Sequence, residues 1–205
     1  MRVLNLYAGV GGNRKLWDGV EVTAVEYNEK IADIYQALYP DDTVIRADAH
    51  DYLLHHHDEF DFVWSSPPCQ THTRMVKATR HKKRRYPDMK LYEEILYLEH
   101  NRKAPWVVEN VAPYYGGMRK YTQVGRHLFW SNMALQGIID QPRPPNFINL
   151  CNTEGAQKMK DWLGIQYEKN VYYEGNHCPA QVLRNCVHPE IGKQVLDRAT
   201  RSRQA

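Results

Sequence analysis

The stretch RVLNLYAGVGG, residues 2–12, decides the expected fold of this chain. Its apolar first part, residues 2–7, predicts a short β-strand, and the glycines within residues 9–12 follow at once. Glycine has no Cβ, so a glycine-rich turn after a strand lets the backbone approach a ligand closely. Most short motifs of this kind bind nothing specific, so the rest of the chain must decide whether this one does.

Alternating strands and helices continue from this turn. Apolar segments predict strands at residues 20–27, 43–47, 60–65 and 106–108, and helical spacing predicts helices at 29–39 and 89–100. Strand, helix and strand at this spacing form right-handed crossovers, so we expect an α/β fold with an open, mostly parallel sheet and helices on both faces. After residue 130 the pattern weakens, and helices are expected only near 155–163 and 190–199.

Polar motifs gather at the carboxyl ends of the expected strands, where open α/β sheets bind their ligands. Five motifs share this position: the glycine turn, Glu26, Asp48, Cys69 and Glu109. One such coincidence would carry little weight, whereas five predict a single site. Glu26 is placed to accept hydrogen bonds from both ribose hydroxyls of an adenosine. Tyr7 and Tyr27 would then flank the adenine; otherwise they simply pack in the core or at the surface.

Cys69 lies in the sequence SSPPCQ, residues 65–70, directly after an expected strand. A lone cysteine is usually a small buried apolar residue. This one stands behind two prolines that fix the backbone, and it precedes a run of basic residues. Nearby positive charge lowers the pKa of a thiol, and the resulting thiolate is a good nucleophile toward an electron-poor ring carbon. We therefore expect Cys69 to be a nucleophile.

Glu109 lies in the sequence VVENV, residues 107–111, at the end of another expected strand. A carboxylate among apolar residues loses solvation, which favours the protonated form and suits the group to donating or sharing a proton. A structural glutamate in a salt bridge is the simpler interpretation. The presence of Cys69 in the same expected site favours the catalytic one.

The net charge of +3 is small, but the positive charges are unevenly placed. A basic loop, residues 74–85, holds seven cations and no acid: Arg74, Lys77, Arg80, Lys82, Lys83, Arg84 and Arg85. Such a loop is either a solvated surface or a grip on nucleic-acid phosphates, and its position after Cys69 favours the second. The basic residues of the tail, Arg198, Arg201 and Arg203, leave both interpretations open.

Length and cysteine content set further limits. A chain of 205 residues is long enough for one domain with a substantial core. The first residues lack the apolar stretch of a signal peptide, so the four cysteines are expected to be thiols and the protein cytoplasmic. His177, Cys178, Cys186 and His188 match no zinc-motif spacing, so no metal site is expected. No apolar run approaches the roughly 20 residues of a membrane span.

In combination these motifs resemble the C5-cytosine DNA methyltransferases. Residues 7–12 correspond to the family's F-x-G-x-G loop, and Glu26 and Asp48 to the acids after its second and third strands. Residues 68–70 are similar to the catalytic P-C-Q motif and residues 109–111 to the E-N-V motif. The last motif, G-N-x-V, is matched imperfectly by Arg184-Asn185-Cys186-Val187. The order is the family's, and the match covers residues 1–130 and 181–199.

The resemblance implies a Rossmann-like, class I S-adenosylmethionine-dependent methyltransferase acting on double-stranded DNA. It implies that a cytosine is flipped out of the duplex, that Cys69 adds to C6, and that Glu109 holds N3 and the exocyclic amine while C5 takes the methyl group. The implied cofactor contacts are Tyr7, Ala8, Gly9, Gly11, Gly12, Glu26, Tyr27, Asp48, Pro67 and Asn185. Gln70 and the basic loop would contact the DNA.

The chain departs from the family in three places. The family usually has Gln and two Arg after E-N-V; here Gln123 and Arg126 are present, and Arg126 is the candidate for a second base or phosphate contact. Arg184 and His188 replace a glycine and a later proline of the last motif. Only residues 131–180 fill the place of the target-recognition domain. We therefore expect a catalytic domain at residues 1–130 and 181–205 with a small recognition insertion, or a protein partner that supplies recognition.

Two other enzyme activities and one binding role are open from the sequence. Methylation of RNA is one, although the Cys-Phe-Thr signature of the tRNA-methylating branch is absent from the sequence. Methylation of a free cytosine nucleotide is another, and the basic loop argues against it. A catalytically silent partner of a split enzyme would not need Cys69 and Glu109. The small size suggests a phage or mobile-element origin, as in restriction–modification systems.

Overall fold

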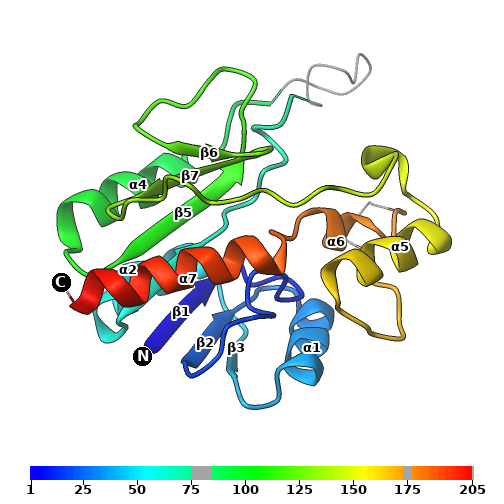
Figure 1. Ribbon diagram of the computed structural model, residues 1–205, viewed down its shortest axis with the longest axis horizontal. Coiled ribbons are helices and arrows are strands. Elements are labelled where there is room, and N and C mark those ends of the chain that lie inside the picture. Colours follow the sequence, from blue (N-terminus) through cyan, green and yellow to red (C-terminus); the bar gives the residue numbers. More distant parts are fainter. Residues whose placement is uncertain (75–84, 173–176, 205) are drawn as a thin grey trace.

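The computed structural model describes residues 1–74, 85–172 and 177–204 (Figure 1). Strand β1 (Arg2–Leu6) lies inside a seven-stranded sheet of order β3-β2-β1-β4-β5-β7-β6. It pairs in parallel with β2 (Glu21–Val25) and β4 (Phe62–Ser65). β3 (Thr43–Ile45) joins β2, and β5 (Trp106–Val111) joins β4, again in parallel. The expected open, mostly parallel sheet is confirmed.

An antiparallel hairpin completes the sheet and was not expected from the sequence. β7 (His127–Ser131) pairs with β5, and β6 (Thr122–Val124) pairs with β7. The chain turns between them at Gly125, which has a φ of 56° that glycine adopts without strain. Because β7 pairs along its whole length, β5 extends past residue 108. Glu109 therefore lies within a strand, opposite Phe129, rather than beyond its end.

Helices cover both faces of the sheet. α1 (Glu29–Leu38) and α7 (Pro189–Gln204) pack on one face, while α2 (Ala49–His56) and α4 (Lys90–Asn101) pack on the other (Figure 1). The alternation within β1 explains both layers, since Val3 faces the α7 side and Leu4 the α2 side. α2, which the sequence pattern did not reveal, is capped by Asp48, whose side chain accepts from the backbone N–H of His50 and Asp51. It is followed by the 3₁₀ turn η1 (His57–Glu59).

The crossover from β1 to β2, residues 7–20, is described throughout and consists of turns rather than a helix. The C-terminal helix α7 packs there instead. Gly192 of α7 has no room for a side chain, because a Cβ would lie 2.1 Å from the backbone oxygen of Asn13. The last helix is thus fixed against the turn that follows β1.

The described part of residues 131–180 first packs on the main core, where Leu135 is buried, and then forms a small lobe beside the carboxyl ends of the strands (Figure 1). It contains the 3₁₀ turn η2 (Phe147–Asn149) and helix α5 (Thr153–Leu163), and it packs against α6 (Gln181–Arg184). Its apolar side chains share one cluster with Val10 of the glycine turn and Ile31 of α1. A role for this lobe as a recognition insertion stays a prediction. Among the described residues, no helix is long and apolar enough to cross a membrane.

Candidate active site

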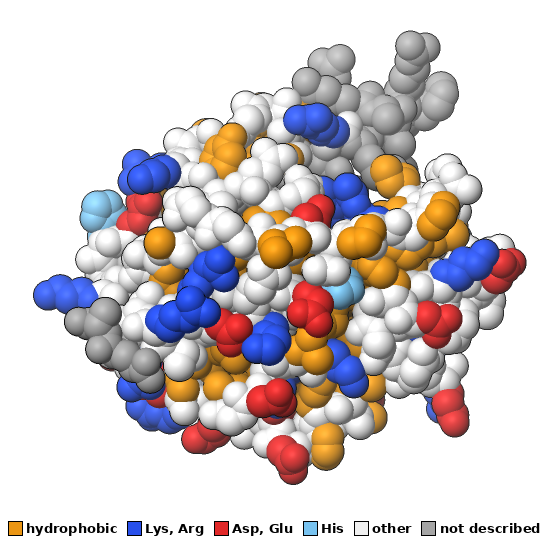
Figure 2. Space-filling view, in the orientation of Figure 1, with side chains coloured by type: hydrophobic (Ala, Val, Ile, Leu, Met, Phe, Trp, Pro, Cys, Tyr) orange, Lys and Arg blue, Asp and Glu red, His pale blue; other side chains and the backbone are white. Residues whose placement is uncertain are grey.

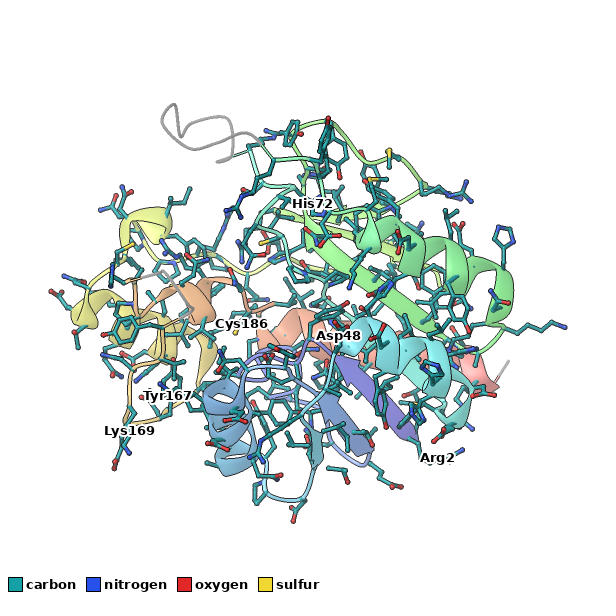
Figure 3. All side chains as sticks on the ribbon, turned by 180° about the vertical axis from the view of Figure 1, so that it is seen from behind. Arg2, Asp48, His72, Tyr167, Lys169 and Cys186 are labelled. Atoms are coloured by element: carbon teal, nitrogen blue, oxygen red, sulfur yellow. The ribbon has the colours of Figure 1, made fainter. Side chains whose placement is uncertain are left out.

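A cavity of about 330 Å³ opens at the carboxyl ends of β1, β2, β4 and β5. Its lining includes nearly all of the residues proposed from the sequence for cofactor and catalysis: Tyr7, Ala8, Gly9, Gly12, Glu26, Tyr27, Asp48, Pro67, Cys69, Gln70, Glu109, Arg126 and Asn185. Asp48, before α2, and Cys186, after α6, are labelled in Figure 3 and both belong to this lining. The structure therefore gathers motifs from the whole length of the chain around one space.

The glycine turn forms one wall of the cavity. Gly9 has a φ of 57° and donates its backbone N–H to Oε2 of Glu26 at 3.0 Å. Gly12 lies against the last motif, since a Cβ there would be 2.5 Å from Cβ of Cys186. Gly11 lies behind the wall rather than on it: a Cβ would meet the ring of Tyr39 at 2.3 Å. Glycine at position 11 is thus explained by packing as well as by its positive φ.

Glu26 is held by the backbone at both carboxylate oxygens. Oε2 accepts from Gly9, and Oε1 accepts from the N–H of Asn28 at 2.8 Å. Burial raises the pKa of Glu26, and backbone hydrogen bonds from Asn28, Gly9 and Tyr27 oppose this effect. Each oxygen keeps a second lone pair for a ligand donor. The neighbouring Tyr27 is 79% exposed, so its ring can cover a ligand held by Glu26.

A buried carboxylate that the sequence did not single out supports the floor of the site. Glu94 of α4 is 1% exposed and accepts from the hydroxyl of Tyr7 at 2.6 Å and of Ser65 at 2.5 Å. Nδ1 of His50 lies 3.0 Å from the same carboxylate. Burial raises the pKa of Tyr7 far above its ordinary range, so its hydroxyl stays a donor. Glu94 could have been noticed, because it shares the inward face of α4 with Leu91 and Leu98.

Cys69 is half-buried and lies at the turn after β4. Its backbone oxygen accepts from the N–H of His72 at 3.0 Å and of Thr73 at 3.1 Å, which fixes the turn. Burial and the charge of Glu109 raise the pKa of the Cys69 thiol, and Arg126 only partly opposes them. Among the described residues the pKa of this thiol is therefore raised rather than lowered, and the basic loop expected to activate it lies mostly outside them.

Glu109 of β5 is 4% exposed and is hydrogen-bonded at both oxygens. Oε2 accepts from the hydroxyl of Ser66 at 2.9 Å, and Oε1 lies 2.5 Å from Nδ1 of His127. The next residue, Asn110, donates its side-chain amide to the backbone oxygen of Pro67 at 2.8 Å. This bond ties the turn that carries Cys69 to β5, so the thiol and the carboxyl are held in one frame. Sequence reasoning did not find His127.

Arg126 lies at the hairpin turn and lines the cavity with Cys69 and Glu109. Its Nε donates to Nε2 of His127 at 3.2 Å, and its Nη2 donates to the backbone oxygen of Arg184. The guanidinium also lies 5.2 Å from the ring centre of Phe147. Burial lowers the pKa of Arg126, but an arginine keeps its charge through shifts of this kind.

Arg184, which stands where the family has glycine, does not enter the cavity. Its guanidinium binds the backbone oxygen of Ile148, the side-chain oxygen of Gln181 at 2.9 Å and Sγ of Cys178 at 3.0 Å. This arginine therefore fastens the small lobe to the last motif. Because its own backbone oxygen accepts from Arg126, the lobe and the cavity are joined through one residue.

The remaining cysteines and histidines do not gather around a metal. Within the described ranges, no three His, Cys, Asp or Glu side chains are placed to hold one, and none of the four cysteines is in a disulfide. Cys186 is buried in the cavity wall, and burial raises its pKa to about 12. His188 instead contacts the backbone oxygen of Trp162 at 3.1 Å.

The basic residues proposed for DNA contact are only partly described. Arg74 and Arg85 are exposed at the two ends of the basic loop; Lys77, Arg80, Lys82, Lys83 and Arg84 lie outside the described residues. In the tail, Arg198 donates to the backbone oxygens of Gln194 and Gln136, and Arg203 pairs with Asp61 at 3.0 Å. Figure 2 shows acidic and basic side chains mixed over α7, which favours an ordinary solvated face there.

Comparison with known proteins identifies the family of this chain. The C-5 cytosine-specific DNA methylase family model matches residues 1–119, more than half of the chain. The chain belongs to this family. A search of curated protein sequences finds no match.

Among solved structures, three methyltransferases resemble this chain to different degrees. The methyltransferase EhMeth of Entamoeba histolytica is 11% identical, with a TM-score of 0.57 over 100% of this chain and 99% of the other. A DNMT2 variant from Spodoptera frugiperda is 22% identical, with a TM-score of 0.41 over 57% of this chain and 37% of the other. An S-adenosylmethionine-dependent methyltransferase from Agrobacterium tumefaciens is 19% identical, with a TM-score of 0.36 over 59% and 40%. The likeness to EhMeth supports the Rossmann-like methyltransferase fold.

Proposed function

We propose that this chain transfers a methyl group from S-adenosylmethionine to C5 of cytosine in double-stranded DNA. The observation that carries the proposal is the single cavity shared by the glycine turn, Cys69 and Glu109. Family membership alone supports cytosine chemistry; the cavity adds that the nucleophile and a ligand-binding loop open into the same space.

The residues present fit the cofactor. Glu26 offers two carboxylate oxygens to the ribose hydroxyls, and the exposed ring of Tyr27 would stack on the adenine. Asp48 also lines the cavity, and Gly12 lies against the last motif, to which Asn185 belongs. When bound, the cofactor supplies an electrophilic methyl group.

Cys69 and Glu109 would have different roles toward the cytosine base. As the S–H bond of Cys69 is lost and an S–C6 bond forms, N3 of the ring takes up a proton, and Glu109 is the group that holds this edge. C5 thereby becomes nucleophilic. After methylation, loss of the C5 proton and cleavage of the S–C6 bond restore the aromatic ring and the thiol. Flipping the base costs a few kcal/mol, which contacts to the DNA must offset.

DNA contacts are proposed at the rim of the cavity. Gln70 is exposed there, Arg126 lies within, and Arg74 and Arg85 mark the ends of the basic loop. Phosphate contacts from such residues fix position without reading sequence. Sequence readout would fall to the small lobe, residues 131–180, or to a protein partner.

Substrate class is tested by offering three cytosine sources with labelled cofactor: unmethylated duplex DNA, RNA of the same sequence and free cytosine nucleotides. We expect 5-methylcytosine in the DNA alone, mapped by sequencing, and none with Cys69→Ala. Cys151→Ala is the matched control, because that thiol lies outside the cavity lining. Methylation of RNA only, or normal turnover by Cys69→Ala, would overturn the proposal.

A further inference from the structure

We propose that His127 is a positioning residue that fixes the donor and acceptor pattern of the Glu109 carboxyl. The inference rests on the proposed function for the role of Glu109 toward cytosine. His127 lies in the strand after E-N-V, beside Arg126, and none of the sequence motifs assigns it a role.

The side chains of His127 and Glu109 are in close contact and are almost fully shielded from solvent. Nδ1 of His127 lies 2.5 Å from Oε1 of Glu109, and the two side chains are 7% and 6% exposed. The antiparallel pairing of β5 with β7 sets this contact. His127 lies opposite Val111, two residues from Glu109 along β5, so the two side chains are diagonal neighbours on one face of the sheet. A hydrogen bond to a carboxylate in such surroundings is strong, since little water competes for it.

The other ring nitrogen defines the tautomer. Nε of Arg126 carries a hydrogen that it cannot lose, and it points at Nε2 of His127 at 3.2 Å. Nε2 must therefore be an acceptor and carry no hydrogen. The ring hydrogen then lies on Nδ1 and is donated to Glu109. The hydrogen bonds of His127 therefore run in one direction, from Arg126 through the ring to the carboxyl.

Because of this direction, the two carboxyl oxygens of Glu109 have different hydrogen-bond partners. Oε1 receives a nitrogen donor, which disfavours a proton on that oxygen. Oε2 meets the hydroxyl of Ser66 at 2.9 Å, and a hydroxyl can donate or accept. A proton on Glu109 is therefore favoured on Oε2, with Oε1 kept as an acceptor.

A carboxyl with one protonated and one unprotonated oxygen is complementary to the edge of cytosine that carries N3 and the exocyclic amine. Cytosine presents an acceptor at N3 and a donor at its exocyclic amine, so it needs one protonated and one unprotonated oxygen. Uracil presents the reverse, a donor at N3 and an acceptor at O4. With Oε2 toward N3, His127 matches Glu109 to cytosine and opposes uracil.

The test compares three variants in single-turnover methylation of duplexes carrying cytosine or uracil at the target position. His127→Leu removes the donor; His127→Asn keeps a donor near the place of Nδ1; His57→Leu changes a histidine of η1 outside the cavity lining. Loss of a hydrogen bond to a charged group lowers a rate about 10–150-fold. In His127→Leu we expect such a loss of rate with cytosine, a much smaller loss with uracil, and unchanged cofactor affinity. In His127→Asn we expect the rate with cytosine to recover to within about threefold of the wild-type rate.

Nitrogen-15 NMR of the resting protein supplies a readout that needs no turnover. We expect the His127 ring to carry its hydrogen on Nδ1 and none on Nε2. A ring protonated on Nε2, or equal losses for cytosine and uracil without rescue by asparagine, would overturn the inference and leave the proposed function intact. Failure of the wild-type chain to methylate cytosine would instead refute the proposed function, and with it the role given to His127.

Discussion

Replacing Glu26 by glutamine isolates the charge that the account assigns to ribose binding. The glutamine is nearly isosteric, but its NH₂ must face one of the two backbone donors, Gly9 or Asn28. Hydrogen bonds to a charged group contribute about 1.5–3 kcal/mol each, so we expect S-adenosylmethionine affinity to fall about 10–150-fold. Calorimetric titration measures this directly. Glu29→Gln is the matched control, because Glu29 lies in the first turn of α1 and outside the cavity lining.

The same carboxylate predicts a pH dependence. Burial raises the pKa of Glu26, and the form that accepts from ribose hydroxyls is the carboxylate. Cofactor affinity is therefore full above the pKa of Glu26 and is lost as the pH falls through it. Because this pKa is raised, the loss begins at a higher pH than for an ordinary glutamate near 4.5. In Glu26→Gln this acidic loss should disappear; equal affinity in wild type and variant across the pH range would refute the reasoning.

Three further predictions follow from the thiols, the last motif and the basic loop. A hydrogen bond with Cys178 lowers the pKa of Cys151 whereas burial raises that of Cys69, so iodoacetamide at neutral pH should alkylate Cys151 first, as mass spectrometry would show. Arg184→Gly, which restores the family residue, should speed amide exchange at residues 147–150, and unchanged exchange would mean that the arginine holds nothing there. Replacing residues 82–85 by alanine should reduce the slope of log DNA affinity against log salt concentration by about 0.9 per lost phosphate contact. An unchanged slope would mean that these residues are only a solvated surface patch.

The rim of the site was predictable because its motifs each follow a strand. Glu26 and Asp48 come directly after apolar segments, and parallel strands bring their carboxyl ends to one edge. Local sequence was enough to place them. The glycine turn was predictable for the same reason, although the packing of Gly11 against Tyr39 depends on a helix that lies far from it in sequence.

The residues that escaped prediction depend on pairing between distant segments. The contact of His127 with Glu109 requires an antiparallel hairpin, and strands of three and five residues leave little periodicity to detect. Glu94 meets Tyr7 only because α4 packs against β5, on the same face of the sheet as α2. For Cys69 the sequence shows nearby basic residues but not the burial that raises the thiol's pKa.

The central claim is that Cys69 bonds covalently to C6 of cytosine. Duplex DNA with 5-fluorocytosine at the target position tests it most directly, because fluorine at C5 cannot leave as a proton and the S–C6 bond cannot be released. Incubation with S-adenosylmethionine, digestion and mass spectrometry would locate the adduct. We expect a stable protein–DNA adduct on Cys69, formed only when cofactor is present. An adduct on Cys151, Cys178 or Cys186, or methylation without any adduct, would contradict it.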